Sequence, residues 1–156
     1  MKNSAQLTAS ILDNIMQQAI DIAKNSDGDV PVGAVIVKNG EIIASACNER
    51  EKINDTTAHA EILAIRLACE KLGNWRLDDC ELYVTLEPCP MCAWAILQSR
   101  MKSVYFGSFD KQYGAFGSAL DLRVQAHSKL KVYSGILEEE CDNVIDAFWQ
   151  KRRNHD

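Results

Sequence analysis

Two short motifs constrain the fold of this chain more than any other part of its sequence. The first is His59-Ala60-Glu61, and the second is Pro88-Cys89-Pro90-Met91-Cys92. Together they supply one imidazole, two thiols and one carboxylate. Imidazole and thiolate groups are common zinc ligands, and a zinc ion with three protein ligands keeps a fourth position for water. We therefore assign His59, Cys89 and Cys92 as zinc ligands and Glu61 as the catalytic proton carrier, and any fold of the chain must bring them together.

Both motifs are expected at the starts of helices. A helix that is apolar nearly all round is predicted to follow a cap at Thr56 or Thr57, with His59 in its first turn, and to end before Gly73. Pro90 occupies a typical first helical position and predicts a second helix behind the cysteine motif. Helix N-termini carry partial positive charge, which lowers the pKa of nearby thiols and favours the thiolates that zinc binds.

Strand and helix patterns alternate along the rest of the chain. Apolar stripes predict a first helix from about Ser10 and a last helix at 137–153, and Asn39-Gly40 predicts a hairpin turn. Strands are expected at 32–37, 41–47, 82–86, 104–107 and 130–133. This order predicts an α/β protein with three layers, α/β/α, in which a mixed five-stranded sheet has helices on both faces. We expect one domain over 1–156, with residues 1–9 flexible.

Composition excludes several classes of protein. The chain has 156 residues and a formal net charge of −5, which argues against a strongly basic surface that coats nucleic acid. No apolar run is long enough to span a bilayer, and polar residues interrupt the first helix, unlike a secretory signal, so we expect a cytoplasmic protein. Four further cysteines have no ligand spacing and are interpreted as small buried apolar residues: Cys47, Cys69, Cys80 and Cys141.

The pairing of His-x-Glu with Pro-Cys-x-x-Cys is the established signature of the zinc-dependent nucleobase deaminases. The chain resembles one family in that group, the bacterial tRNA-specific adenosine deaminases, which convert adenosine to inosine at the anticodon wobble position. The resemblance extends over most of the chain and includes the segments 29–34, 57–61, 74–77, 83–89, 99–100, 106–107, 114–118, 135–137 and 148–153.

The resemblance implies a cytidine-deaminase-like fold and hydrolytic deamination of a flipped adenosine. It also implies one Zn²⁺ per subunit, a homodimer, and a tRNA anticodon stem-loop as partner. The residues implied to bind the substrate base or shape its pocket are Asn48, Val30, Ala60 and Asp110. Those implied to contact the RNA are Phe148, Lys151, Arg152 and Arg153.

Two other functions fit the motifs. A zinc deaminase of a free base or nucleoside, such as guanine or cytidine, would carry the same metal site. A non-catalytic zinc module that binds RNA would need a fourth protein ligand, for which Cys47, Cys80 and His127 are candidates, and it would leave Glu61 without a role. The aromatic and basic residues in the last third of the chain favour RNA.

Four positions depart from the family pattern. Glu49 stands where an arginine is expected and Thr56 where a proline is usual. Trp94 replaces a small residue in the second helix, and Phe109 replaces a basic residue beside Asp110. None of the four is a proposed metal ligand, so these departures concern RNA binding and packing more than the chemistry.

Overall fold

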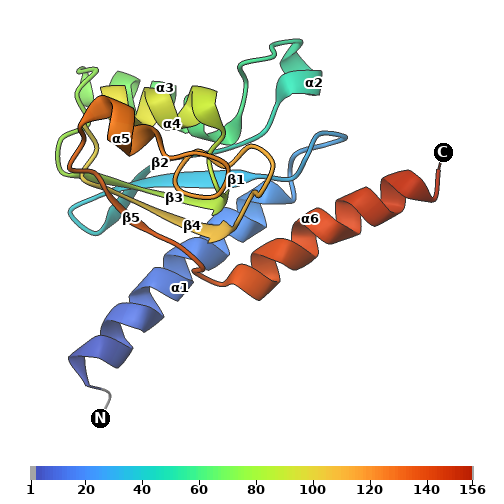
Figure 1. Ribbon diagram of the computed structural model, residues 1–156, viewed down its shortest axis with the longest axis horizontal. Helices are drawn as coiled ribbons and strands as arrows, with labels where there is room; N and C mark the ends of the chain where they lie inside the picture. Colours follow the sequence, from blue (N-terminus) through green and yellow to red (C-terminus); the bar gives the residue numbers. More distant parts are fainter. Residues whose placement is uncertain (1–2, 156) are drawn as a thin grey trace.

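The fold is organised by one mixed five-stranded sheet, which the computed structural model describes together with its helices over residues 3–155 (Figure 1). The strand order is β2-β1-β3-β4-β5. The strands are β1 (Gly33–Lys38), β2 (Glu41–Cys47), β3 (Cys80–Leu86), β4 (Ser103–Ser108) and β5 (Lys131–Tyr133). β1 is antiparallel to both β2 and β3, whereas β3, β4 and β5 are mutually parallel. The predicted mixed sheet of five strands is thereby confirmed.

Helices cover both faces of the sheet, as the three-layer prediction requires (Figure 1). They are α1 (Ser4–Ala23), α2 (Arg50–Ile53), α3 (Ala60–Leu72), α4 (Pro90–Gln98), α5 (Leu122–Ala126) and α6 (Glu138–Arg153). α3 and α4 pack on one face, and α1 and α6 pack on the other. Among the described residues, no helix is long and apolar enough to cross a membrane.

The side chains of β1 pack into two hydrophobic clusters, one on each face of the sheet. Ala34 and Ile36 are buried in the cluster that includes α3 and α4. Val35 and Val37 are buried in the cluster that includes α1 and Cys141 of α6. Because successive side chains of a strand point to opposite faces, a continuous apolar run is what a strand covered on both faces requires.

The connection between β1 and β2 is the predicted hairpin. Asn39 and Gly40 both have positive φ, at 52° and 76°. A two-residue turn of this kind matches the twist of the strands that it joins. Since β1 is antiparallel to β2 and to β3, the carboxyl ends of β2 and β3 lie at the same edge of the sheet. α3 and α4 begin beyond that edge, which brings the two motif-bearing helix starts together.

The first helix begins earlier than the predicted start at about Ser10, because residues 4–9 belong to α1. The helix begins early because Asn3 and Gln6 form a capping box, in which each side chain accepts a hydrogen bond of 2.9 Å from the other residue's backbone N–H. Residues 1 and 2, which belong to the segment expected to be flexible, lie outside the described residues. Two helices, α2 and α5, were not predicted from the sequence, since they have only four and five residues.

Two glycines permit the closest contacts between helix and sheet. A Cβ atom on Gly33 of β1 would lie 1.9 Å from the backbone oxygen of Ala19 in α1. A Cβ atom on Gly107 of β4 would lie 2.2 Å from Sγ of Cys141 in α6. Ser108, beside Gly107, donates a hydrogen bond of 2.5 Å to Asp142. These contacts hold α6 against β4.

We expect Gly33→Ala to destabilise the protein. The obstacle is helix backbone rather than a movable side chain, so α1 must shift, and forcing a methyl group into such a contact costs about 1–3 kcal/mol or more. Urea unfolding of the substituted and unsubstituted proteins measures the change. Ser45→Ala on the exposed side of β2 is the control, with an expected change within about 0.5 kcal/mol. Equal stability of the two variants would contradict the close packing of α1 on β1.

Candidate active site

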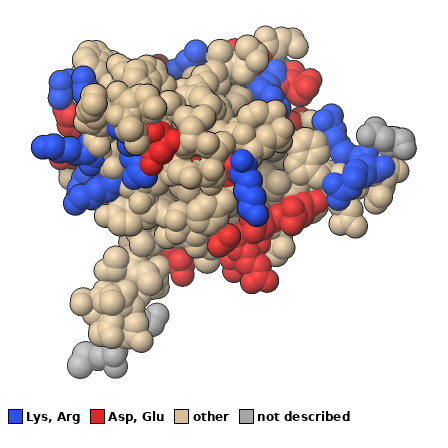
Figure 2. All heavy atoms as spheres, viewed as in Figure 1, with Lys and Arg blue, Asp and Glu red and all other residues tan. Residues whose placement is uncertain are grey.

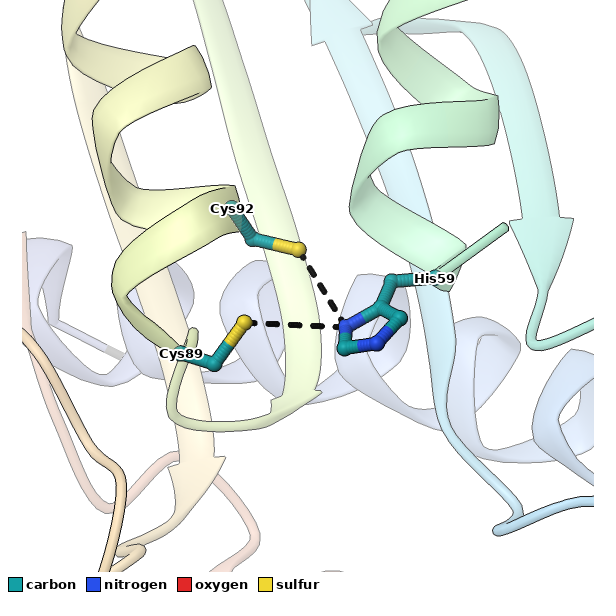
Figure 3. Close-up of side chains that lie close together, drawn as sticks. All are labelled: His59, Cys89 and Cys92. Atoms are coloured by element: carbon teal, nitrogen blue, oxygen red, sulfur yellow. Dashed lines mark hydrogen bonds between the residues drawn. The ribbon is translucent and has the colours of Figure 1, made fainter. Parts of the chain in front are cut away.

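His59, Cys89 and Cys92 meet at the edge of the sheet where α3 and α4 begin (Figure 3). His59 is the N-cap of α3 and Cys89 is the N-cap of α4, with Pro90 at the first helical position. Nδ1 of His59 lies 3.6 Å from Sγ of Cys89 and 3.5 Å from Sγ of Cys92. The prediction that the two motifs converge is thus confirmed.

The two distances from Nδ1 of His59 to the sulfur atoms fit a zinc ion, and all three ligand atoms lie within 4.8 Å of one another. With metal–ligand bonds of about 2.0–2.3 Å and tetrahedral angles, two ligand atoms are separated by about 3.5 Å. The imidazole turns Nδ1, not Nε2, toward both sulfur atoms (Figure 3). Within the described residues 3–155, this is the only group of three or more histidine, cysteine, aspartate or glutamate side chains that lie close enough together to hold a metal ion. Cys47, Cys80 and His127, the candidates for a fourth ligand, are not part of it.

The three groups also alter one another's ionisation. Hydrogen bonding from Cys92 and from His59 lowers the pKa of the Cys89 thiol to about 4. The same contact with Cys89, together with burial, raises the pKa of Cys92. The hydrogen bond to Cys89 raises the pKa of His59. One thiolate is thus readily formed, and a bound divalent cation supplies the positive charge that lets the second thiol ionise.

Glu61 lies in the first turn of α3, close to the three ligands. Glu61 is only 4% exposed, yet it forms part of the wall of a cavity of about 750 Å³. Burial raises the pKa of Glu61 to about 7, because the charged carboxylate loses its contact with water. A carboxylate that exchanges a proton near neutral pH suits general acid–base chemistry.

The cavity joins the metal-binding group to the surface. His59, Glu61 and Cys89 form part of its wall. Apolar side chains line other parts, namely Val30, Val32, Leu86 and Ile145. Aromatic and polar side chains complete it, among them Asn48, Arg50, Phe109, Asp110, Tyr113 and Trp149. A largely apolar pocket with a few convergent polar groups is typical of a small-molecule or base-binding site.

Three of the four residues predicted to bind the base or shape its pocket line the cavity, and one does not. Val30 and Asn48 line the cavity, whereas Ala60 is fully buried in the core and does not. Asn48 donates a hydrogen bond of 2.9 Å to the Val30 oxygen and accepts one of 2.8 Å from the Ala60 nitrogen. Its amide therefore joins one cavity wall to the start of α3 and keeps one N–H for another partner.

Asp110 also lines the cavity and organises its own loop. One carboxylate oxygen of Asp110 accepts hydrogen bonds from the backbone nitrogens of Gln112, at 3.1 Å, and of Tyr113, at 3.0 Å. Such a turn around an aspartate fixes the local backbone. Phe109, before Asp110, and Tyr113 in the turn both present exposed rings.

On α6, Ile145 and Trp149 line the cavity, whereas Phe148, which was predicted to contact the RNA, does not. Phe148 is half-buried and packs edge-to-face on Trp149, and the guanidinium of Arg152 lies over its ring. Lys151, Arg152 and Arg153 are exposed at the end of the helix, where Figure 2 shows basic side chains gathered, while acidic side chains gather near its start.

Arg50 and Trp149 are among the cavity residues that were not predicted from the sequence. The guanidinium of Arg50 binds the buried carboxylate of Asp29 through two nitrogens, at 3.1 and 2.9 Å. No short motif marks this pair, whose members are 21 residues apart. Trp149 could have been found, because Cys141, Ile145 and Trp149 recur every four residues and thus share one face of α6.

Comparison with known proteins agrees with this geometry. Residues 9–108 match the family described as the cytidine and deoxycytidylate deaminase zinc-binding region. The chain is 49% identical over 142 residues to a tRNA-specific adenosine deaminase of Bacillus subtilis, with 88% of each chain covered.

Two solved structures are also similar. One, from a study of A-to-I editing by tRNA:A34 deaminases, is 42% identical with a TM-score of 0.79, and the match covers 84% of this chain and 98% of that one. The other, guanine deaminase of Bacillus subtilis, is 45% identical with a TM-score of 0.60, and the match covers 62% of this chain and 64% of that one. The chain therefore belongs to the family of zinc-binding cytidine and deoxycytidylate deaminases and, within it, to the tRNA-specific adenosine deaminases.

Proposed function

We propose that this protein is a zinc-dependent hydrolase that deaminates adenosine to inosine at the wobble position of a tRNA anticodon loop. The observation that carries the proposal is the placement of a buried carboxylate, Glu61, and a His-Cys-Cys metal-binding group in the wall of one cavity. In this proposal His59, Cys89 and Cys92 hold the metal. When bound, zinc lowers the pKa of water towards about 7 and so makes hydroxide available at neutral pH.

Glu61 carries the protons of the reaction. It takes a proton from the attacking water and delivers it to N1 of the adenine. The oxygen of that water bonds to C6. Glu61 then takes the proton of the new C6 hydroxyl group and passes it to the amino group, the C6–N bond breaks, and ammonia leaves. The overall reaction consumes one water and yields inosine. A buried carboxyl with a raised pKa can both accept and return protons in this way.

The rim of the cavity supports an RNA substrate. Phe109, Tyr113 and Trp149 offer aromatic faces on which unstacked bases can stack. Arg50 provides a fixed guanidinium at the same cavity. We assign contacts with the flipped nucleotide to Asn48, Val30 and Asp110, and contacts with the anticodon loop to Phe148, Lys151, Arg152 and Arg153. Ala60 shapes the base pocket indirectly, because its backbone N–H donates to the Asn48 side chain.

Similarity favours tRNA over a free base. The match to the guanine deaminase structure leaves out more than a third of either chain, whereas the match to the A34 deaminase structure covers nearly all of that chain. The non-catalytic alternative needs a fourth protein ligand, and none joins the metal-binding group in the described part of the chain. We further propose that 1–156 form a single deaminase domain and that the protein is cytoplasmic, where its tRNA substrate is found.

We also propose that the protein is a homodimer. Exposed apolar side chains on α4 and α5, two helices in contact with each other, support this assembly: Met91 and Trp94 of α4, Val124 of α5, and Leu120 just before α5. Trp94 is 42% exposed and lies two residues after the metal-binding Cys92. Exposed apolar surface of this kind marks interfaces in soluble proteins. An interface here would lie beside the metal-binding helix.

We expect His59→Ala to lose zinc and activity together, because two remaining ligands cannot complete the three-ligand site. The zinc content of the purified protein, measured by atomic emission, tests this. Cys69→Ala, a cysteine of α3 outside the ligand group, is the matched control and should keep one zinc per chain. A His59→Ala protein that holds stoichiometric zinc and remains active would refute the proposed site.

We expect Glu61→Gln to keep zinc but to lower turnover by about 10²–10⁴-fold, since the amide cannot carry the proton. The assay measures inosine in an anticodon stem-loop with adenosine at the wobble position, with free adenosine, guanine and cytidine in parallel. Glu70→Gln, an exposed acid on the same helix, should leave the rate unchanged. Turnover of a free base or nucleoside alone would contradict the tRNA proposal but retain the zinc chemistry.

We expect the protein to have twice the monomer mass of 17.4 kDa in solution, as measured by light scattering after gel filtration. Trp94→Lys should shift it toward the monomer, because a charge at the centre of an apolar interface must be desolvated. Trp75→Lys changes an exposed tryptophan outside α4 and α5 and should leave the mass unchanged. A monomeric wild-type protein at tens of micromolar would exclude the homodimer.

A further inference from the structure

We propose that Glu87 is a positioning residue, which holds the loop from Phe109 to Ser118 in the conformation that forms one wall of the cavity. The inference deepens the proposed function, because that loop carries Asp110 and two of the aromatic rim residues. Glu87 follows β3 and lies two residues before the metal-binding Cys89. It thus links the loop to the segment that carries the metal ligands.

The contacts of Glu87 identify what it holds. Glu87 is only 2% exposed, and four groups of the loop donate hydrogen bonds to its carboxylate. Oε1 accepts from the backbone nitrogen of Asp110 at 3.2 Å and from the hydroxyl of Ser118. Oε2 accepts from the backbone nitrogens of Phe116 and Ser118, both at 3.1 Å. These donors belong to both ends of the loop, so one side chain closes it.

The same contacts distinguish a positioning role from a catalytic one. A carboxylate has about four lone-pair sites, and the four donors of the loop use all of them. Glu87 therefore keeps no acceptor for substrate or water, although it borders the cavity. Glu61, in contrast, is the acid that the mechanism needs.

The loop is built closely around this carboxylate. A Cβ atom on Gly114 would lie 2.4 Å from Cδ of Glu87, so only glycine lets the backbone pass. The Ala115 nitrogen donates to the Pro88 oxygen at 2.9 Å, and the Glu87 nitrogen donates to the Ser108 oxygen at 2.8 Å. The loop and the start of the cysteine motif thus share one hydrogen-bond network.

Glu87→Gln tests the proposal with almost no change of shape. The amide NH₂ cannot accept a hydrogen bond, so at least one backbone N–H loses its acceptor whichever way the amide is turned. A buried unsatisfied donor is costly, and we expect amide hydrogen exchange in 109–118 to accelerate about tenfold or more. Zinc content should remain one per chain, because no metal ligand changes.

The matched control is Glu81→Gln in β3, the strand that Glu87 follows. Glu81 accepts only from the hydroxyls of Ser103 and Tyr105, each at 2.9 Å, and hydroxyls can turn to accept from an amide. Exchange in 109–118 should be unchanged in this variant. If Glu87→Gln does not fold, Ser118→Ala removes one donor and should accelerate exchange in the same segment to a smaller extent. Unchanged exchange in 109–118, or acceleration spread evenly over the protein, would overturn the proposal.

A double-mutant cycle tests the link to activity on the stem-loop. In the wild-type background, Glu87→Gln should lower kcat/KM about tenfold or more. In a protein that already carries Asp110→Ala, the same substitution should lower kcat/KM less than about threefold, because Glu87 acts through the loop that carries Asp110. Equal losses in both backgrounds would refute action through this loop. The exchange and zinc measurements need no substrate, so they still test Glu87 if the wild-type protein does not deaminate the stem-loop.

Discussion

The antiparallel pairing of β1 with both β2 and β3 is the constraint on which the site depends. It makes β2 and β3 parallel, so the segments after them leave the sheet at the same edge. One segment leads to α3 and the other to α4, and the caps of these helices are His59 and Cys89. A metal site formed by residues far apart in sequence thus follows from strand direction alone.

The position of the site at two helix starts has a chemical consequence. Helix N-termini present unpaired N–H groups and partial positive charge, which favour thiolates over thiols. Yet Glu61 lies in the same first turn of α3 and has a raised pKa, because burial outweighs the favourable interactions. The same neighbourhood therefore favours a charged sulfur and a carboxyl that exchanges its proton, two states that a hydrolytic site requires.

Much of this arrangement could be predicted from sequence because it depends on local signals. Asn39-Gly40, Gly73 and Pro90 mark a turn, a helix end and a helix start, and each does so in the structure. The missed features depend on contacts distant in sequence. Arg50 is placed by Asp29, and the loop around Asp110 is held by Glu87. No periodic sequence pattern connects the members of such pairs, so they are recognised only once the backbone is folded.

The departures from the family pattern lie where the structure can accept them. Glu49 precedes Arg50, whose guanidinium lines the cavity, so a cation is present there despite the acid. Trp94 lies on an exposed face of α4 and does not crowd the core. Phe109 packs edge-to-face on Phe106 at 5.3 Å and is still 44% exposed at the cavity. Only Phe109 of these three residues lines the cavity, so it alone changes what can approach the cavity. None of the three belongs to the metal-binding group, which stays in place together with Glu61.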